Sequence, residues 1–248
     1  LNQDRTIDEA GQRRLIRYYL AAGAGGLAVA VHTTQFQIRA AAVGLFEPVL
    51  RITADEISRY ESKTGRTVIR IAGACGPETQ AVAEAELAAR LAYDAVLLSP
   101  GGLQAASEDD LIARTRAVGC ILPVIGFYLQ PAVGGRILSF AYWQKLCALN
   151  EVVAIKAAPF DRYLTLDVLR AAALSERTGP IALYTGNDDH ILLDLLTEHV
   201  FQENGRTGSI RFAGGLLGHW AVWTNSAVSL FNRLKKERAG QTLSTDWL

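Results

Sequence analysis

Residues 123–156 read PVIGFYLQPAVGGRILSFAYWQKLCALNEVVAIK and contain two short apolar runs separated by an amphipathic stretch. The runs, 124–129 and 152–156, are short enough for strands that are buried on both faces. Between them, apolar residues recur at helical spacing over 138–149. A strand, a helix and a second strand in this order predict a parallel pair joined by a helical crossover.

The same alternation continues along the whole chain without a long linker or a break in composition. It predicts a parallel sheet covered by helices. The other predicted strands are 26–31, 67–73, 95–99, 181–185 and 209–213, and the predicted helices are 7–22, 77–91, 108–118, 138–149, 164–175, 189–199 and 218–238.

Seven strands preceded by a helix favour a (β/α)8 barrel, the TIM-barrel fold, and 248 residues are a usual length for one. We expect a single barrel domain over 1–248, with a C-terminal helical segment from about 218. The first strand is missing from this count and is expected before Leu1, where the sequence starts without methionine. A doubly wound open sheet is the alternative, but its glycine-rich fingerprint does not follow the first predicted strand.

Composition excludes several classes of function. Lys+Arg 25 balance Asp+Glu 25, which leaves no basic footprint for nucleic acid. No apolar run is long enough for a membrane helix. Cys75, Cys120 and Cys147 are scattered and are expected to be reduced thiols of a cytoplasmic protein.

Lys156 is the most informative residue because it ends the apolar run Val152–Ile155. Burial disfavours the charged form of lysine and lowers its pKa. A neutral amine at the carboxyl end of a barrel strand can attack a carbonyl group and form a Schiff base. The alternative is a lysine that reaches solvent at the barrel mouth or pairs with Asp161.

Other candidate residues also follow predicted strands. Tyr128 could transfer a proton beside Lys156 or be a core aromatic. The stretch His32-Thr33-Thr34 could hold a carboxylate or form a capped turn. Gly214 and Gly215 could bind an anion at a helix start or form a tight turn.

The remaining polar and aromatic groups are interpreted as structural. Asp188, Asp189 and His190 are interpreted as helix caps rather than metal ligands, and no metal site is expected. His219, Trp220 and Trp223 are interpreted as core or subunit interface.

Taken together, these stretches resemble the dihydrodipicolinate synthase / N-acetylneuraminate lyase family of Schiff-base-forming barrels. The segment Tyr128 to Lys156 resembles the family's tyrosine-to-lysine segment, and 22–34 resembles its second strand and threonine-containing loop. Ile71-Ala72-Gly73 and the stretch 185–189 are similar to two further strand ends. The resemblance covers about 7–196.

The resemblance implies a lyase or aldolase acting on pyruvate or another 2-keto acid, with no cofactor beyond the lysine. Lys156 would be the Schiff-base lysine and Tyr128 the proton-transferring tyrosine. Thr33 and Thr34 would hold the keto-acid carboxylate, and Gly186 would line the site. His32 stands where the family commonly has threonine or serine. The resemblance also implies a homo-oligomer, either dimer or tetramer.

Two departures argue against dihydrodipicolinate synthase itself. Gly101 and Gly102 stand where the synthases carry a loop tyrosine, and Ala132-Val133 stand where they carry an arginine, with Arg136 following later. The two glycines are expected to widen the mouth for a bulkier second substrate. The alternative function is a non-covalent barrel that binds a phosphorylated or acidic metabolite.

Overall fold

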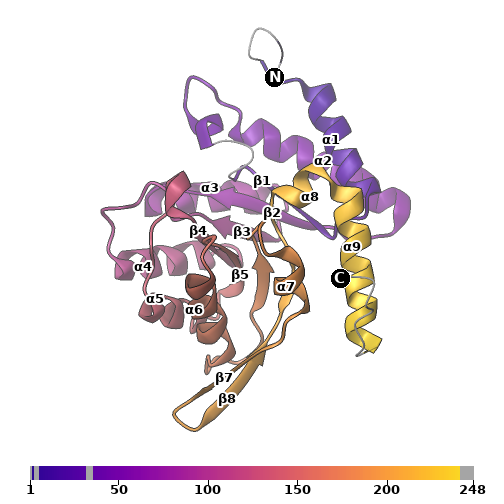
Figure 1. The fold of residues 1–248 in the computed structure, drawn as a ribbon. Coiled ribbons are helices and arrows are strands. Elements are labelled where there is room, and N and C mark those ends of the chain that lie inside the picture. Colours follow the sequence, from indigo (N-terminus) through magenta and orange to yellow (C-terminus); the bar gives the residue numbers. More distant parts are fainter. Residues whose placement is uncertain (1, 3–5, 32–35, 241–248) are drawn as a thin grey trace.

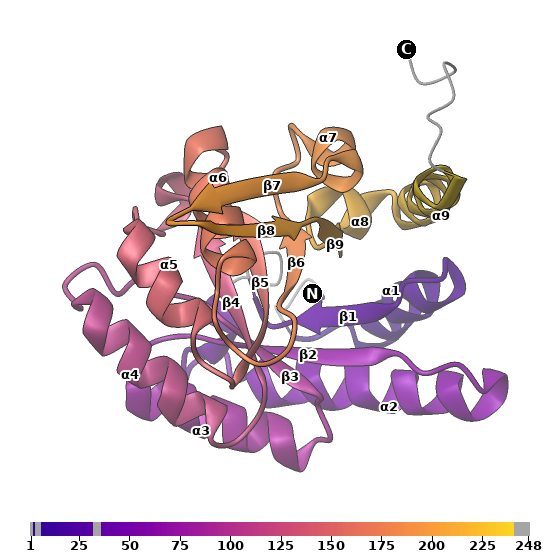
Figure 2. The same cartoon turned by 90° about the horizontal axis from the view of Figure 1, so that it is seen from below.

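The computed structural model describes residues 2, 6–31 and 36–240. Seven parallel strands form one curled sheet in sequential order, and helices cover its outer face (Figure 1, Figure 2). The strands are β1 Gly26–Val29, β2 Ile69–Ala74, β3 Ala95–Leu98, β4 Val124–Leu129, β5 Val152–Ala158, β6 Ala182–Thr185 and β9 Phe212–Gly215.

The helices follow the strands in regular alternation. They are α1 Glu9–Ala21, α2 Phe46–Thr64, α3 Glu78–Arg90, α4 Glu108–Gly119, α5 Phe140–Cys147, α6 Arg162–Ala173, α7 Ile191–Leu196, α8 Gly218–Val222 and α9 Thr224–Gly240, with short 3-10 turns at Phe36–Arg39 and Pro131–Val133. Helix α2 was not among the predicted helices, and the predicted helix 218–238 is broken at Trp223 into α8 and α9.

The sequential strand order confirms the predicted barrel architecture and excludes the doubly wound sheet, whose strand order reverses at a switch point. The seven strands make an incomplete (β/α)8 barrel. Within the described residues, no strand pairs with both β1 and β9. The helices approach one another across this gap, where the Tyr19 hydroxyl of α1 donates to the Ala221 carbonyl of α8 at 3.0 Å.

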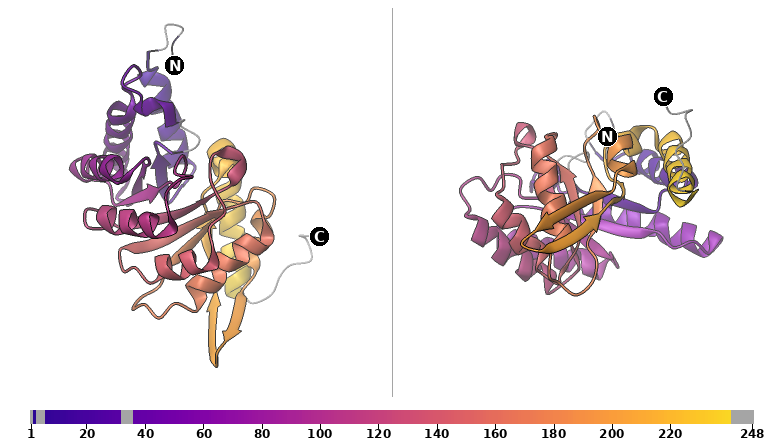
Figure 3. Two further views of the ribbon diagram at one scale, coloured as in Figure 1. Left: turned by 90° about the vertical axis from the view of Figure 1, so that its left-hand side faces the viewer. Right: turned by 60° about the horizontal axis from the view of Figure 1, so that its bottom comes forward.

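A hairpin interrupts the alternation between β6 and β9. Strands β7 His199–Glu203 and β8 Arg206–Ile210 pair antiparallel and project from the body (Figure 3). Asn204 and Gly205 connect them with φ of 49° and 77°, the left-handed pair that a tight hairpin turn requires. The predictions for 189–199 and 209–213 were therefore partly wrong, because His199 starts β7, and Ser209 and Ile210 end β8.

The sheet separates two apolar cores. On the outer face, side chains such as Val124, Tyr128 and Ile155 pack against the helices. On the inner face, Ile125 and Phe127 pack with neighbours from the other strands. This alternation along β4 and β5 decides which side chains reach the interior of the barrel.

Candidate active site

Lys156 lies on the inner face of the sheet, toward the carboxyl end of β5. Its neighbours in register are Phe127 on β4 and Tyr184 on β6. The Lys156 Nζ lies 4.5 Å from the centroid of the Phe127 ring. A cation or a polarised amine at this distance is attracted by the ring face.

Burial is the main cause that lowers the pKa of Lys156 to about 8, and the negative charge of Asp188 partly offsets it. Within the described residues, no carboxylate forms an ion pair with this amine. Asp161, the alternative partner, instead accepts from the Leu164 N–H at 2.8 Å and caps α6. At pH 7, roughly one Lys156 in ten is therefore neutral, against roughly one in three thousand for an ordinary lysine.

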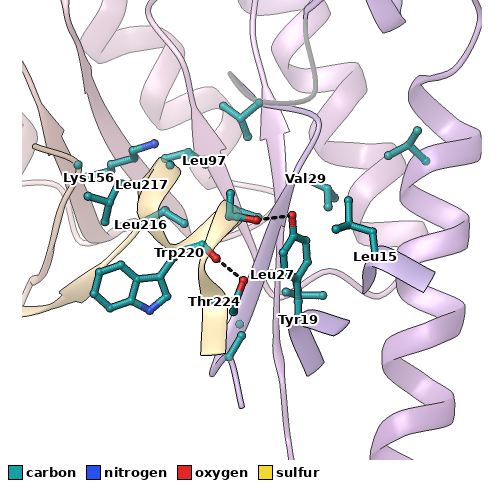
Figure 4. A pocket seen from close by; sticks show the side chains of 18 of the residues that line it. Leu15, Tyr19, Leu27, Val29, Leu97, Lys156, Leu216, Leu217, Trp220 and Thr224 are labelled. Atoms are coloured by element: carbon teal, nitrogen blue, oxygen red, sulfur yellow. Dashed lines mark hydrogen bonds between the residues drawn. The ribbon is translucent and has the colours of Figure 1, made fainter. Parts of the chain in front are cut away.

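A cavity of about 890 Å³ opens beside Lys156 and extends to α1 and α8. Lys156 and Leu97 lie near Leu216 and Leu217 at one side, and Leu15 and Tyr19 of α1 lie at the other (Figure 4). Part of this volume lies in the gap between β1 and β9, because residues of both edge strands and of α1 and α8 line it. Trp220, interpreted from sequence as core or subunit interface, is one of its lining residues.

Gly186 packs directly against the lysine. A Cβ at this position would lie 3.0 Å from the Lys156 Cε and 2.5 Å from the Ala158 Cβ. The Gly186 N–H donates to the Ala157 carbonyl at 2.6 Å, which joins the ends of β5 and β6. The close approach therefore requires glycine at this position.

A buried polar network lies behind the loops that follow β5 and β6. Asp194 accepts from Thr185 Oγ1 at 2.5 Å and from Arg162 Nη1 at 2.7 Å. Asn187 Nδ2 donates to Thr165 Oγ1 at 3.1 Å, and Asn187 Oδ1 accepts from the Phe160 N–H at 3.0 Å. The network fixes both loops beside the cavity. The members of this network lie far apart in the sequence. The only sign of it there was that polar residues stand at the ends of the predicted strands and helices.

The described residues hold no cluster of three metal-ligating side chains. The sequence predicted that Asp188 caps α7, but its carboxylate instead accepts from the His219 N–H of α8 at 3.1 Å.

No helix in the described part of the chain is long and apolar enough to cross a membrane. Cys75, Cys120 and Cys147 are free thiols, as predicted.

Comparison with known proteins gives matches at the level of structure. No family model and no curated protein matches the sequence. A YagE prophage protein of the dihydrodipicolinic acid synthase family from E. coli K12, solved with pyruvate, superposes with a TM-score of 0.75 at 18% identity over 97% of this chain and 74% of that one. N-acetylneuraminate lyase from Fusobacterium nucleatum gives 0.73 at 17% identity, covering 97% and 74%. Dihydrodipicolinate synthase from Oceanobacillus iheyensis gives 0.71 at 16%, covering 97% and 71%.

The chain has the fold of the dihydrodipicolinate synthase and N-acetylneuraminate lyase structures. The resemblance expected from the motifs is thereby confirmed for the fold.

One residue expected at the site of a dihydrodipicolinate synthase-like barrel lies elsewhere. Tyr128 points to the outer face of β4, where its ring packs against Trp143 at 4.8 Å between centroids. Its hydroxyl accepts from the Leu138 N–H at 3.3 Å. Phe127, one residue earlier, occupies the inner face beside Lys156. The expectation that Tyr128 stands beside the lysine was therefore wrong, because neighbouring residues of a strand face opposite sides.

Gly214 and Gly215 do not lie at a helix start, where the sequence predicted an anion site. Both glycines belong to β9 and pair with Tyr184 and Thr185. The adjoining helix start receives the Asp188 carboxylate, which occupies the N–H group of His219 and repels an incoming anion. The predicted carboxylate-binding residues His32, Thr33 and Thr34 lie outside the described residues, and Val31 and Gln37 on either side line the cavity.

The positions that depart from the dihydrodipicolinate synthases also have structural roles. Gly101 and Gly102 form a turn after β3 and are not among the described residues that line the cavity, so the expected widening by them was wrong. Arg136 donates to the carbonyl groups of Leu103, Gln104 and Ala106. Val133 does line the cavity.

Proposed function

We propose that this protein is a class I lyase or aldolase in which Lys156 forms a Schiff base with pyruvate or another 2-keto acid. The observation that carries the proposal is the position of Lys156: an amine with a pKa lowered to about 8, on the inner face of a barrel sheet, beside a large cavity. The structural neighbours include a family protein solved with pyruvate, which supports the same class of substrate.

The chemistry follows from the amine. The neutral Lys156 nitrogen attacks the ketone carbon, and loss of water gives an iminium ion. When the substrate is a 4-hydroxy-2-oxo acid, a base takes the proton of the 4-hydroxyl group and the bond between carbons 3 and 4 breaks, which releases an aldehyde. The electron pair of that bond passes to the iminium ion, which becomes an enamine. Protonation of the enamine and addition of water return the keto acid and the free lysine.

Side chains near Lys156 support these steps. The Phe127 ring face stabilises the positive charge that develops on the nitrogen. Gly186 leaves room for the covalent adduct at the lysine. Asp188 is a carboxylate of the same cavity whose charge reaches Lys156, and we assign it the proton transfer for which Tyr128 is badly placed.

The predicted carboxylate-binding role of Thr33 and Thr34, with His32, remains part of the proposal. It is supported by Val31 and Gln37, which flank that stretch and line the cavity.

Reductive trapping tests the proposal. Borohydride added with pyruvate is expected to leave a stable adduct on Lys156, located by peptide mass spectrometry, and Lys156→Arg is expected to abolish it. Lys145→Arg is the matched control because Lys145 makes a surface ion pair with Asp109 at 2.6 Å. Equal labelling of other lysines, or no adduct with any of several keto acids, would overturn the proposal.

The non-covalent alternative, a barrel that binds a phosphorylated or acidic metabolite, finds less support. Among the described residues that line the cavity, Lys156 is the only cation, and Asp8 and Asp188 are both acidic. Retained binding of inorganic phosphate by Lys156→Arg, without an adduct in the native protein, would favour this alternative.

A further inference from the structure

We propose that Phe160 is a specificity-determining residue whose ring contacts the part of the substrate beyond the keto-acid group and favours an apolar extension there. This inference rests on the proposed Schiff-base function and deepens it. It is carried by the backbone conformation of Phe160, by the exposure of its side chain and by its position two residues after β5.

The backbone of Phe160 has a φ of 54°, in the left-handed region that disfavours bulky side chains. The other non-glycine residues with positive φ in the described part of the chain are Ala30, Ala92 and Asn204. Alanine is small, and the short polar side chain of asparagine tolerates this conformation. Phe160 is therefore the one bulky side chain in this set, and glycine would adopt the same conformation without the steric cost.

The chain around Phe160 fixes the turn. The Phe160 N–H donates to Asn187 Oδ1 at 3.0 Å, and Asn187 is only 2% exposed. The next residue, Asp161, is the N-cap of α6 and accepts from the Leu164 N–H at 2.8 Å. These contacts use the backbone of residue 160, so the passage from β5 to α6 requires the left-handed conformation but not a phenyl ring.

The ring of Phe160 does not belong to the core. Phe160 is 40% exposed and is not a member of the buried apolar clusters of the described residues. An apolar residue before a helix cap often packs against the fourth residue of the helix, which here is Thr165. Thr165 is polar, and its hydroxyl donates to the Asp161 carbonyl and accepts from Asn187 Nδ2. An exposed ring kept in a costly backbone conformation points to a role in function.

Phe160 lies beside the proposed active site on the continuous side of the sheet. Lys156 precedes the end of β5 by two residues and Phe160 follows it by two, so Phe160 lies nearer the mouth, the end of the barrel at which the strands finish. Both residues line the cavity, together with Val133 after β4 and with Gly186 and Asp188 after β6. Strands β4, β5 and β6 pair directly with one another, so this wall lies away from the gap between β1 and β9.

A substrate held by Lys156 directs its far end toward this ring. The Schiff base fixes carbon 2 at Nζ, and the active sites of barrels open at the carboxyl ends of the strands. Each methylene group buried against an apolar surface favours binding by up to about fourfold. Pyruvate ends at carbon 3, so Phe160 distinguishes extended keto acids from pyruvate without taking part in the bond to the lysine.

Reductive trapping of two keto acids tests this role. The amine adds to carbon 2, water leaves, and hydride from borohydride reduces the iminium ion to a stable secondary amine. 2-Oxohexanoate carries an apolar extension and has no 4-hydroxyl group, so its adduct is not cleaved. In the native protein we expect half-maximal labelling of Lys156 by 2-oxohexanoate at a concentration at least tenfold below that for pyruvate.

Variants at position 160 assign this preference to the ring. Phe160→Asn keeps the left-handed turn and removes the ring, so it should lower the preference at least fivefold and leave pyruvate labelling within twofold of the native value. Phe160→Tyr keeps the ring and should keep the preference. Ala92→Gly is the matched control, because it relaxes another left-handed residue at an exposed position after α3. It should leave the preference unchanged.

Thermal unfolding separates this role from a structural one. Phe160→Asn and Phe160→Gly remove the steric cost of the left-handed conformation, so we expect Tm to rise or to stay within about 2 °C of the native value. A ring that served the core would instead lower Tm by several degrees when removed. A lowered Tm together with an unchanged preference in both variants would overturn the assignment of Phe160.

The outcomes separate the two proposals. A pyruvate adduct on Lys156 with an unchanged or increased preference for 2-oxohexanoate in Phe160→Asn would overturn the role of Phe160 alone. No adduct with either keto acid would overturn the Schiff-base function and this inference with it. If Phe160→Asn fails to fold by circular dichroism, Phe160→Gly is measured in its place. A native preference for pyruvate would overturn the inference whatever the variants show.

Discussion

The amine of Lys156 lies over the aromatic ring of Phe127, 4.5 Å from its centroid, and the two residues are register partners on adjacent strands. The ring supplies an apolar floor that removes water from the amine while its face still attracts positive charge. This pair places a nucleophile with a lowered pKa on the wall of the cavity.

The lowered pKa of Lys156 predicts the pH dependence of adduct formation. Only the neutral amine attacks the ketone, so the trapping rate should rise about tenfold per pH unit below pH 8 and level off above it. Trapping rates with pyruvate and cyanoborohydride between pH 5.5 and 9.5 measure this. A midpoint near the ordinary lysine value of 10.5 would contradict the buried position of the amine.

The same shift predicts how stability changes with pH. Between about pH 8 and 10.5 the unfolded chain binds the Lys156 proton and the folded protein does not, so stability rises with pH across this window. Below pH 8 the buried charge opposes folding. Lys156→Met should therefore raise the free energy of unfolding more at pH 7 than at pH 10. Urea denaturation at the two pH values checks this, and an equal effect at both would count against it.

Tyr128→Phe should leave pyruvate trapping and turnover within about threefold of the native values, because the hydroxyl lies on the outer face of β4. It should lower the free energy of unfolding by about 1 kcal/mol through loss of the bond from the Leu138 N–H. Tyr163→Phe, at an exposed tyrosine of α6, is the control. A hundredfold loss of turnover with trapping retained would show that Tyr128 acts in proton transfer after all.

Gly186→Ala should reduce the rate of adduct formation at Lys156 by a hundredfold or more. The new methyl group would overlap Ala158 and press on the lysine side chain. Gly25→Ala is a matched control, since a Cβ there meets nothing within 4 Å. Rates of trapping and circular dichroism on both variants distinguish a blocked lysine from a lost fold, and a native rate in Gly186→Ala would contradict the close packing.

Asp194→Ala should destabilise the protein by about 3 kcal/mol, because it leaves Arg162 and Thr185 without their buried partner. Adduct formation should also slow, since the same network holds the loops that carry Phe160 and Gly186. Glu203→Ala removes the more exposed ion pair with Arg170 and should cost less than 1 kcal/mol. Equal unfolding free energies for the two variants would show that the network does not anchor the site.

Some elements of the fold could be predicted from the sequence and others could not. Strands β4 and β5 were predicted within two residues of their observed ends, because apolar runs of this length between turn residues have few alternatives. The hairpin β7–β8 was missed although Asn204-Gly205 is a strong turn signal. Its strands carry few buried residues, so their pattern resembled the end of a helix and the start of a strand.

The sequence by itself determined the alternation of strands and helices, the barrel class and Lys156 as the candidate nucleophile, since these depend on local apolar patterns and on one costly residue in such a pattern. Only the tertiary structure decided that Phe127 and not Tyr128 faces that lysine. The spacing between Tyr128 and Lys156 counts residues but not faces, and the register of β4 on β5 shifts between Val124 and Ile125. A shift of one residue turns every following side chain to the opposite face of a strand. The tertiary structure also brought Asp188, Leu217 and Trp220 to Lys156 from distant parts of the chain, which no local pattern could specify.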